Sequence, residues 1–178
     1  MISSWSTCHK ILHILMFITS FGEQNITYKC CSNFLIHLFN RRAWDTFLDL
    51  EEDRCKTYGH PTTVIIIDLN DLKAINDKFG HSAGDQMIQK TAEILKKNVR
   101  SNDLVARLGG DEFGILNIET TLENTQKLVN RLLKSLQNAG INAAVGVAAR
   151  EPSKNLRVAV IEADEKMYQH KRQIKVII

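Results

Sequence analysis

The chain has 178 residues, of which 44% are hydrophobic and 24% are charged, so it can form one domain with a sizeable core but not a second full domain. The formal net charge is +3, and no block of lysine and arginine is long enough to follow a nucleic acid backbone. We therefore expect no nucleic acid polymer as a partner, and a small anionic ligand instead. The spacing of Cys8, Cys30, Cys31 and Cys55 gives little support to a zinc site or a disulfide framework, which indicates a reduced, cytoplasmic compartment.

Residues 1–32 are interpreted as an N-terminal extension of unknown role. Its apolar run over 11–21 is shorter than the roughly 20 residues that cross a bilayer, so we expect no membrane span within this chain. A helix that packs on the domain is the favoured interpretation. A poorly ordered extension and a secretory signal peptide are the alternatives.

From Asn40 onward the hydrophobic pattern is regular and predicts helices that cover a mixed sheet, an α+β fold of the α/β sandwich type. Ser82 is the expected first residue of one helix, because Asp85 follows it in the capping-box pattern. The other expected elements are a helix containing Trp44, Phe47 and Leu48, a buried strand over 62–70, a helix over 72–78, two strands around the turn at 109–112, a helix over 128–136, a strand over 141–149, a helix over 156–167 and an edge strand over 174–178.

The stretch RLGGDEFGIL, 107–116, predicts a hairpin with small and acidic residues at its tip. Gly109 and Gly110 are expected to supply positive φ and to let a bulky group lie against bare backbone. Asp111 and Glu112 could then approach one ligand together where the chain turns. The alternative is a plain type I′ turn with solvated acids.

Asp68 ends the apolar strand, at the kind of strand end where open α/β sheets place ligands. A carboxylate buried there needs a compensating cation or hydrogen bonds. If the hairpin pairs beside this strand, Asp68, Asp111 and Glu112 converge as oxygen ligands that suit Mg²⁺. The alternative role for Asp68 is a cap for a helix that begins near Asn70.

These motifs together resemble the GGDEF domain of bacterial diguanylate cyclases. The resemblance covers roughly 40–175, and we assign 33–178 to the domain. It implies a five-stranded, helix-flanked sheet like that of nucleotide cyclase and palm-type polymerase domains, and the condensation of two GTP into cyclic di-GMP with release of two pyrophosphates. The matching segments are NRRAW (40–44), DLNDLKAINDKFGHSAGD (68–85), RSNDLVARLGGDEF (100–113), AVGVA (144–148) and ADEKMYQHK (163–171).

The resemblance also implies roles for individual residues. Asp68 and Asp111 would be metal carboxylates for two Mg²⁺ ions, or Mn²⁺, with the Leu69 carbonyl assisting and Glu112 close to the same ions. Asp111 would help to remove the hydroxyl proton, unless a metal-bound hydroxide does so. Guanine would contact Asn76 and Asp85, whose alternatives are a surface residue and a capping-box acid.

Triphosphate neutralisation would come from Lys73 and Lys171, helped by the backbone amides of Asp71 and Leu72 at the first turn of a helix. Arg100 and Asp103 match the RxxD element that binds a cyclic di-GMP dimer in relatives and suppresses turnover; by chance alone, such a pair is also a common surface feature. One GTP per site implies a homodimer during catalysis.

Two segments depart from the family pattern. NFLIHL, 33–38, stands where relatives carry DxLTGL, so Asn33, Ile36 and His37 replace residues that shape the nucleotide pocket. KRQIKV, 171–176, stands where KxxGRN is usual, with Lys175 in place of a phosphate-binding arginine. The alternative to an active enzyme is therefore a catalytically impaired module that binds GTP or cyclic di-GMP as a sensor.

Overall fold

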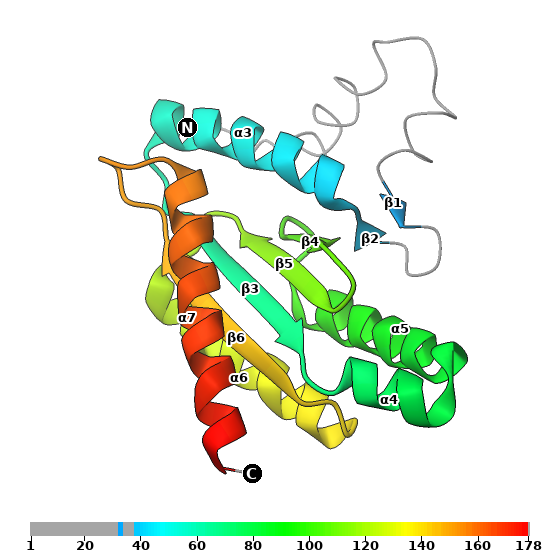
Figure 1. Ribbon diagram of the computed structural model, residues 1–178. Coiled ribbons are helices and arrows are strands. Elements are labelled where there is room, and N and C mark those ends of the chain that lie inside the picture. Colours follow the sequence, from blue (N-terminus) through cyan, green and yellow to red (C-terminus); the bar gives the residue numbers. More distant parts are fainter. Residues whose placement is uncertain (1–31, 34–37, 178) are drawn as a thin grey trace, which may run out of the picture.

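The computed structural model describes residues 32–33 and 38–177, with side chains for 38–174 (Figure 1). The expectations for residues 1–31, for Ile36 and His37, and for the side chains of Asn33 and Lys175 lie outside the described residues. The elements are β1 (Ser32–Asn33), β2 (Leu38–Phe39), α3 (Arg41–Tyr58), β3 (Thr63–Leu69), α4 (Leu72–Phe79), α5 (His81–Asn98), β4 (Leu104–Arg107), β5 (Glu112–Asn117), α6 (Leu122–Asn138), β6 (Ala143–Ala149) and α7 (Leu156–Ile177).

The described strands form one mixed sheet in the order β1-β2-β4-β5-β3-β6. The pair β2 and β4 is parallel, and the other neighbouring strands are antiparallel. Strand β3 lies between β5 and β6 and is buried over its whole length, because its run of β-branched residues can pack on both faces. The predicted α+β sandwich is confirmed, and the strand that is buried over its whole length carries Asp68 next to its last residue.

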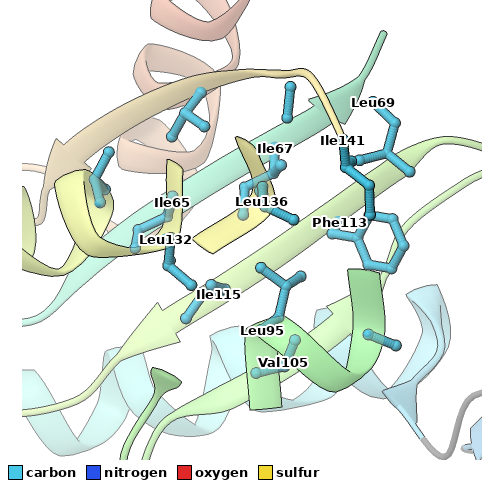
Figure 2. Packing of buried hydrophobic residues seen from close by; sticks show 14 of the residues in the cluster. Ile65, Ile67, Leu69, Leu95, Val105, Phe113, Ile115, Leu132, Leu136 and Ile141 are labelled. Atoms are coloured by element: carbon cyan, nitrogen blue, oxygen red, sulfur yellow. The ribbon is translucent and has the colours of Figure 1, made fainter. Parts of the chain in front are cut away.

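Helices cover both faces of the sheet (Figure 1). On one face, α5 and α6 pack on alternate strand residues such as Ile65, Ile67 and Phe113, shown in Figure 2. On the other face, α3 and α7 pack on Val64, Ile66 and their neighbours. Because successive strand residues point to opposite faces, Asp68 belongs to the same face as Val64 and Ile66, which is the face covered by α7.

The helix ends follow local chemistry. The Asn40 side chain accepts a hydrogen bond from the Ala43 amide at the start of α3, and Gly59, with φ of 70°, ends this helix in the left-handed conformation. The prediction that Ser82 begins the next helix is wrong. Helix α5 begins one residue earlier, at His81 after Gly80, and no side chain caps it. Gly80, with φ of 83°, occupies the N-cap position, so the Ser82 side chain lies inside the helix and cannot cap it.

The predicted edge strand over 174–178 is also wrong, because α7 continues to Ile177. Ile174 is partly buried against the same cluster as Ala163 and Met167, so the helical spacing of apolar residues extends past the point where we expected it to end. The short apolar run at the end of the chain is compatible with either structure. Packing against the sheet decides for the helix.

Two glycines allow the helices to approach the sheet closely. A Cβ at Gly146 of β6 would overlap the carbonyl oxygen of Ala163 and the amide nitrogen of Met167, both on the backbone of α7. A Cβ at Gly114 of β5 would lie 2.9 Å from the ring of Trp44 on α3. Gly114 and Gly146 flank Ile66 in the register of the sheet. These two glycines set how closely α3 and α7 approach the sheet.

Candidate functional site

The acidic residues meet where β3 ends and β5 begins. Asp68 is the direct cross-strand partner of Glu112, so their side chains project from the same face of the sheet. The amide of Leu69 donates a hydrogen bond of 3.0 Å to the carbonyl of Asp111, which attaches the hairpin tip to the end of β3. Asp68 is 5% exposed, whereas Asp111 and Glu112 are partly exposed. The pairing of β3 with β5 thus brings together acids that are distant in the sequence.

The hairpin tip differs from its prediction. Neither Gly109 nor Gly110 has positive φ, so the turn is not of type I′. The tip is closed instead by the amides of Leu108 and Gly109, which donate to the Glu112 carbonyl, and by the Arg107 guanidinium, which donates to the carbonyls of Gly109 and Gly110. A Cβ at Gly110 would meet nothing within 4 Å, whereas a Cβ at Gly109 would lie 3.2 Å from Glu112 Oε2, so of the two glycines it is Gly110 whose backbone is open.

Lys171 of α7 reaches across the sheet to the acidic site. Its ammonium donates to Asp68 Oδ1 at 2.5 Å, from a side chain that is 26% exposed. A residue that we predicted to bind phosphate therefore lies beside a predicted metal ligand, although 103 positions separate the two in the sequence. This lysine neutralises part of the negative charge of the site.

Mutual repulsion shapes the electrostatics of the acids. Burial raises the pKa of Glu112 above its usual value, and the nearby negative charges of Asp68 and Asp111 raise it further. The ligand atoms of these three acids do not form a group in which all lie within 4.8 Å of one another. A shared ion would draw them together and relieve their repulsion. The donor set, which consists of oxygens from carboxylates, is the chemistry that Mg²⁺ prefers, so the residues fit this ion.

The two predicted guanine contacts lie at the junction of α4 and α5. The Asn76 amide packs against Gly84, so closely that a Cβ there would overlap Asn76 Oδ1, and Gly84 directly precedes Asp85. Asn76 Oδ1 is buried without a hydrogen-bond partner, whereas Asp85 is exposed. Helices α4 and α5 thus place an amide oxygen that has no hydrogen-bond partner near an exposed carboxylate.

The predicted anion site lies at the start of α4. Asp71 precedes this helix with φ of 67°, a left-handed conformation that is unfavourable for a residue with a side chain. Leu72 begins the helix and is buried, whereas Lys73 is exposed. Asp68 is not the cap of this helix, because Asp71 occupies that position. Lys175 lies within α7.

Arg100 and Asp103 lie away from the acids, in the turn between α5 and β4. The Arg100 amide donates to Asp103 Oδ2 at 2.8 Å, and the Ile118 amide donates to Asp103 Oδ1 at 3.3 Å. The Asp103 carboxylate therefore also stabilises this turn. Both residues line a pocket of about 280 Å³.

Sequence reasoning missed several other polar residues of this pocket, among them Asn117, Lys127 and Arg131. Asn117 is 2% exposed, and its Oδ1 has no hydrogen-bond partner. Lys127 and Arg131 lie on the same face of α6, four residues apart, and this spacing was the available signal. With Arg100 they make the pocket cationic.

No helix within the described part of the chain has the length and apolar character to span a membrane. The layered fold and the acidic strand ends define an α+β sandwich with a carboxylate site at one end of its sheet. The family model "Diguanylate cyclase, GGDEF domain" matches residues 33–175, and the chain belongs to this family.

Individual relatives agree with this assignment. The chain is 31% identical over 153 residues to the probable diguanylate cyclase DgcJ of Escherichia coli K12, a match that covers 84% of this chain and 31% of DgcJ. The chain thus spans about a third of the length of this relative. Among solved structures, diguanylate cyclase SiaD of Pseudomonas aeruginosa, in complex with its activator SiaC, is 26% identical with a TM-score of 0.77, covering 93% of this chain and 71% of SiaD. A microbial GGDEF domain studied with cyclic di-GMP is 26% identical with a TM-score of 0.78, covering 84% and 95% of the two chains.

Proposed function

We propose that this chain is a diguanylate cyclase module that condenses two GTP molecules into cyclic di-GMP and releases two pyrophosphates. The observation that carries the proposal is the cross-strand pairing of Asp68 with Glu112 beside Asp111 and Lys171. Family membership and the resemblance to a GGDEF domain studied with cyclic di-GMP support it. The domain would comprise residues 33–178.

In this proposal the two nucleotides are joined in two like steps, the second of which closes the ring, and each step releases one pyrophosphate. The 3′-hydroxyl of one attacks the α-phosphorus of the other, the bond to the pyrophosphate oxygen breaks, and the hydroxyl proton leaves. Asp111 lies at the hairpin tip and helps to accept this proton. Gly109 and Gly110 leave room for the substrate beside it. Because one site holds one GTP, two copies of the chain must face each other, and the active form is a homodimer.

Two Mg²⁺ ions, for which Mn²⁺ could substitute, would neutralise the phosphates and lower the pKa of the attacking hydroxyl. Asp68, Asp111, Glu112 and the Leu69 carbonyl would hold them. Lys171 would exchange its contact with Asp68 for a phosphate oxygen, assisted by Lys73 and Lys175 and by the amides of Asp71 and Leu72. Asn76 and Asp85 would recognise guanine through its polar edges. The pocket at Arg100 and Asp103 would bind the product and suppress turnover.

Incubation of the purified chain with GTP and Mg²⁺, followed by mass spectrometry of the nucleotides, tests the proposal. We expect cyclic di-GMP from the unaltered chain and at least about 100-fold less from Asp111→Ala, because the variant loses a charged group at the reacting atoms. Asp53→Ala removes an acid on α3 whose side chain is 80% exposed and serves as the matched control. Equal rates for Asp111→Ala and the control would refute the catalytic assignment. Binding of GTP or cyclic di-GMP without any product would support the alternative, a regulatory module.

A further inference from the structure

We propose that Glu51, Cys55 and His60 form a zinc-binding site at the end of the sheet opposite to the acids. One ligand atom from each residue lies within 4.8 Å of the others. Glu51 and Cys55 are 3% and 2% exposed, and the His60 side chain is 18% exposed. A carboxylate, a thiol and an imidazole form the mixed oxygen, sulfur and nitrogen set that zinc accepts in proteins.

The end of α3 arranges these three groups. Glu51 and Cys55 are four residues apart, so they share one face of the helix. Gly59 then ends the helix, and His60 follows in the turn that leads to β3. The ring of Tyr58 stacks on that of His60 at a centroid distance of 5.9 Å, which orients the imidazole. The helix, its left-handed end and the aromatic contact together bring the histidine back over Glu51.

The hydrogen bonds of the cluster leave one ring nitrogen of His60 without a partner. Glu51 Oε1 accepts from the hydroxyl of Thr62 at 2.8 Å, and the Cys55 thiol lies 3.3 Å from the same hydroxyl. His60 Nδ1 is buried without a hydrogen-bond partner, and its distance of 4.0 Å from Glu51 Oε1 is too long for a hydrogen bond. A buried ring nitrogen that points toward a carboxylate and a thiol without bonding to either is what a metal ligand looks like before the metal binds.

The other nitrogen of the ring faces a carboxylate, at a distance too long for a hydrogen bond. His60 Nε2 lies 3.9 Å from Glu119 Oε1, and ligating histidines commonly direct their second N–H to a carboxylate. Tetrahedral zinc with bonds of roughly 2.0–2.3 Å requires ligand atoms closer together than 4.8 Å, so the turn at His60 must move inward slightly. Water would complete the fourth position, since His60 is the part of the cluster open to solvent.

The charges balance when zinc is bound. Arg54 pairs with Glu51 at 3.0 Å and with Glu119 at 3.4 Å and so contributes one positive charge. Zinc binding would release the Cys55 proton to solvent, and the two positive charges of the ion with that of Arg54 then offset two carboxylates and one thiolate. Burial raises the pKa of the Cys55 thiol, so without the ion the group stays protonated.

The site is separate from the acids of the proposed catalytic centre. Thr62 precedes β3 and Asp68 lies near its other end, about 20 Å away at the rise of an extended strand. Zinc here would connect α3 to the start of β3 and the segment after β5. The proposal thus does not depend on the proposed function, and its test needs no enzyme activity.

Cobalt binding to the 178-residue chain with Cys8, Cys30 and Cys31 changed to serine tests the site, because Cys55 is then the only thiol of this sequence. We expect the near-ultraviolet absorption of a cobalt–thiolate bond, its displacement by zinc, and its disappearance on further change of Cys55→Ser. His60→Ala should weaken cobalt binding at least tenfold, whereas His81→Ala, at an exposed histidine on α5, should not. Absence of the thiolate absorption, or equal affinity in the two histidine variants, would overturn the proposal.

A second measurement uses the chain with all its natural cysteines. We expect zinc to raise the unfolding temperature and to bind with one more ion per chain than in the His60→Ala variant, while His81→Ala retains the full number. Equal zinc content and equal stabilisation in these two variants would contradict the site even if other cysteines bind metal.

Discussion

At the scale of single residues, Glu52 and Arg150 form a charged pair whose side chains are only 11% and 8% exposed. Arg150 donates to both Glu52 oxygens at 2.8 and 2.9 Å, and the Leu156 amide donates to the same carboxylate at 2.7 Å. The hydrogen bond from Arg150 lowers the pKa of Glu52 from 4.5 to about 2, against the opposing effect of burial. This carboxylate therefore links α3, the segment after β6 and the first residue of α7.

The lowered pKa predicts a pH dependence of stability. Since the native pKa lies below the unfolded one, the charged form contributes about 3 kcal/mol above pH 4.5, and this is lost as the pH falls from 4.5 towards 2. Glu52→Gln should thus destabilise the chain by about 3 kcal/mol near pH ~7 and by less than half of that near pH ~3. Urea unfolding at both values measures the difference. Asp53→Asn, at an exposed neighbour, should have little effect, and a pH-independent loss in Glu52→Gln would contradict the assignment.

Lys171 is expected to have one role before substrate binds and another afterwards. It contacts Asp68 directly, and any phosphate or metal that enters the site must compete with this ion pair. The pair keeps the buried carboxylate compensated before substrate binds, as burial of a charge requires. The same lysine is thus suited both to maintaining the folded site and to receiving phosphate.

At the scale of elements, the position of α7 on the sheet controls the site. This helix lies over β6 (Figure 1). It approaches the strand most closely at Gly146, and it carries Lys171 to Asp68. Gly146→Ala should destabilise the chain by at least about 1–3 kcal/mol, because a methyl group would overlap the backbone of α7, which cannot rotate away as a side chain can. It should also lower turnover, since a displaced helix moves Lys171.

Thermal unfolding and the GTP assay measure the two effects of Gly146→Ala. For stability, Gly110→Ala is the matched control, since its added methyl group meets nothing within 4 Å and its φ is not positive. If Gly146→Ala unfolded like the control, the close approach of α7 to β6 would not be a constraint on the fold.

At the scale of the whole molecule, the acids and the pocket at Arg100 and Asp103 lie in different parts of the fold. The acids belong to the face covered by α7, whereas Arg100 and Asp103 line a pocket with residues of α5 and α6. Product bound in that pocket cannot simply displace substrate. Inhibition through this pocket, as proposed above, would therefore act at a distance from the acids.

Arg100→Ala should therefore weaken inhibition by added cyclic di-GMP at least about tenfold, because it removes a charged hydrogen bond to the product. The ratio of initial rates with and without added product measures this effect. Lys134→Ala removes an exposed cation on α6 that does not line the pocket and should leave the ratio unchanged. An identical inhibition constant in Arg100→Ala would exclude this pocket as the inhibitory site.

The sequence alone was sufficient to predict those elements whose structure is determined by local residue patterns. The β-branched run before Asp68 predicted a buried strand, and the apolar spacing of α6 predicted its helix. The predictions from the sequence were wrong for the helix start at Ser82, for the turn type at Gly109 and Gly110, and for the strand over 174–178. In these places the local pattern was compatible with two structures, and a neighbouring turn, the Arg107 side chain or packing on the sheet made the choice.

By itself, then, the sequence determined the fold class, the family and the set of acids, because these depend on periodicity and on motifs that are contiguous in the chain. Only the tertiary structure decided that Asp68 pairs with Glu112, that Lys171 lies on Asp68, that Arg131 shares a pocket with Arg100, and that His60 meets Glu51 and Cys55. Contacts of this kind arise from strand register and helix packing, which bring together residues that no local pattern relates.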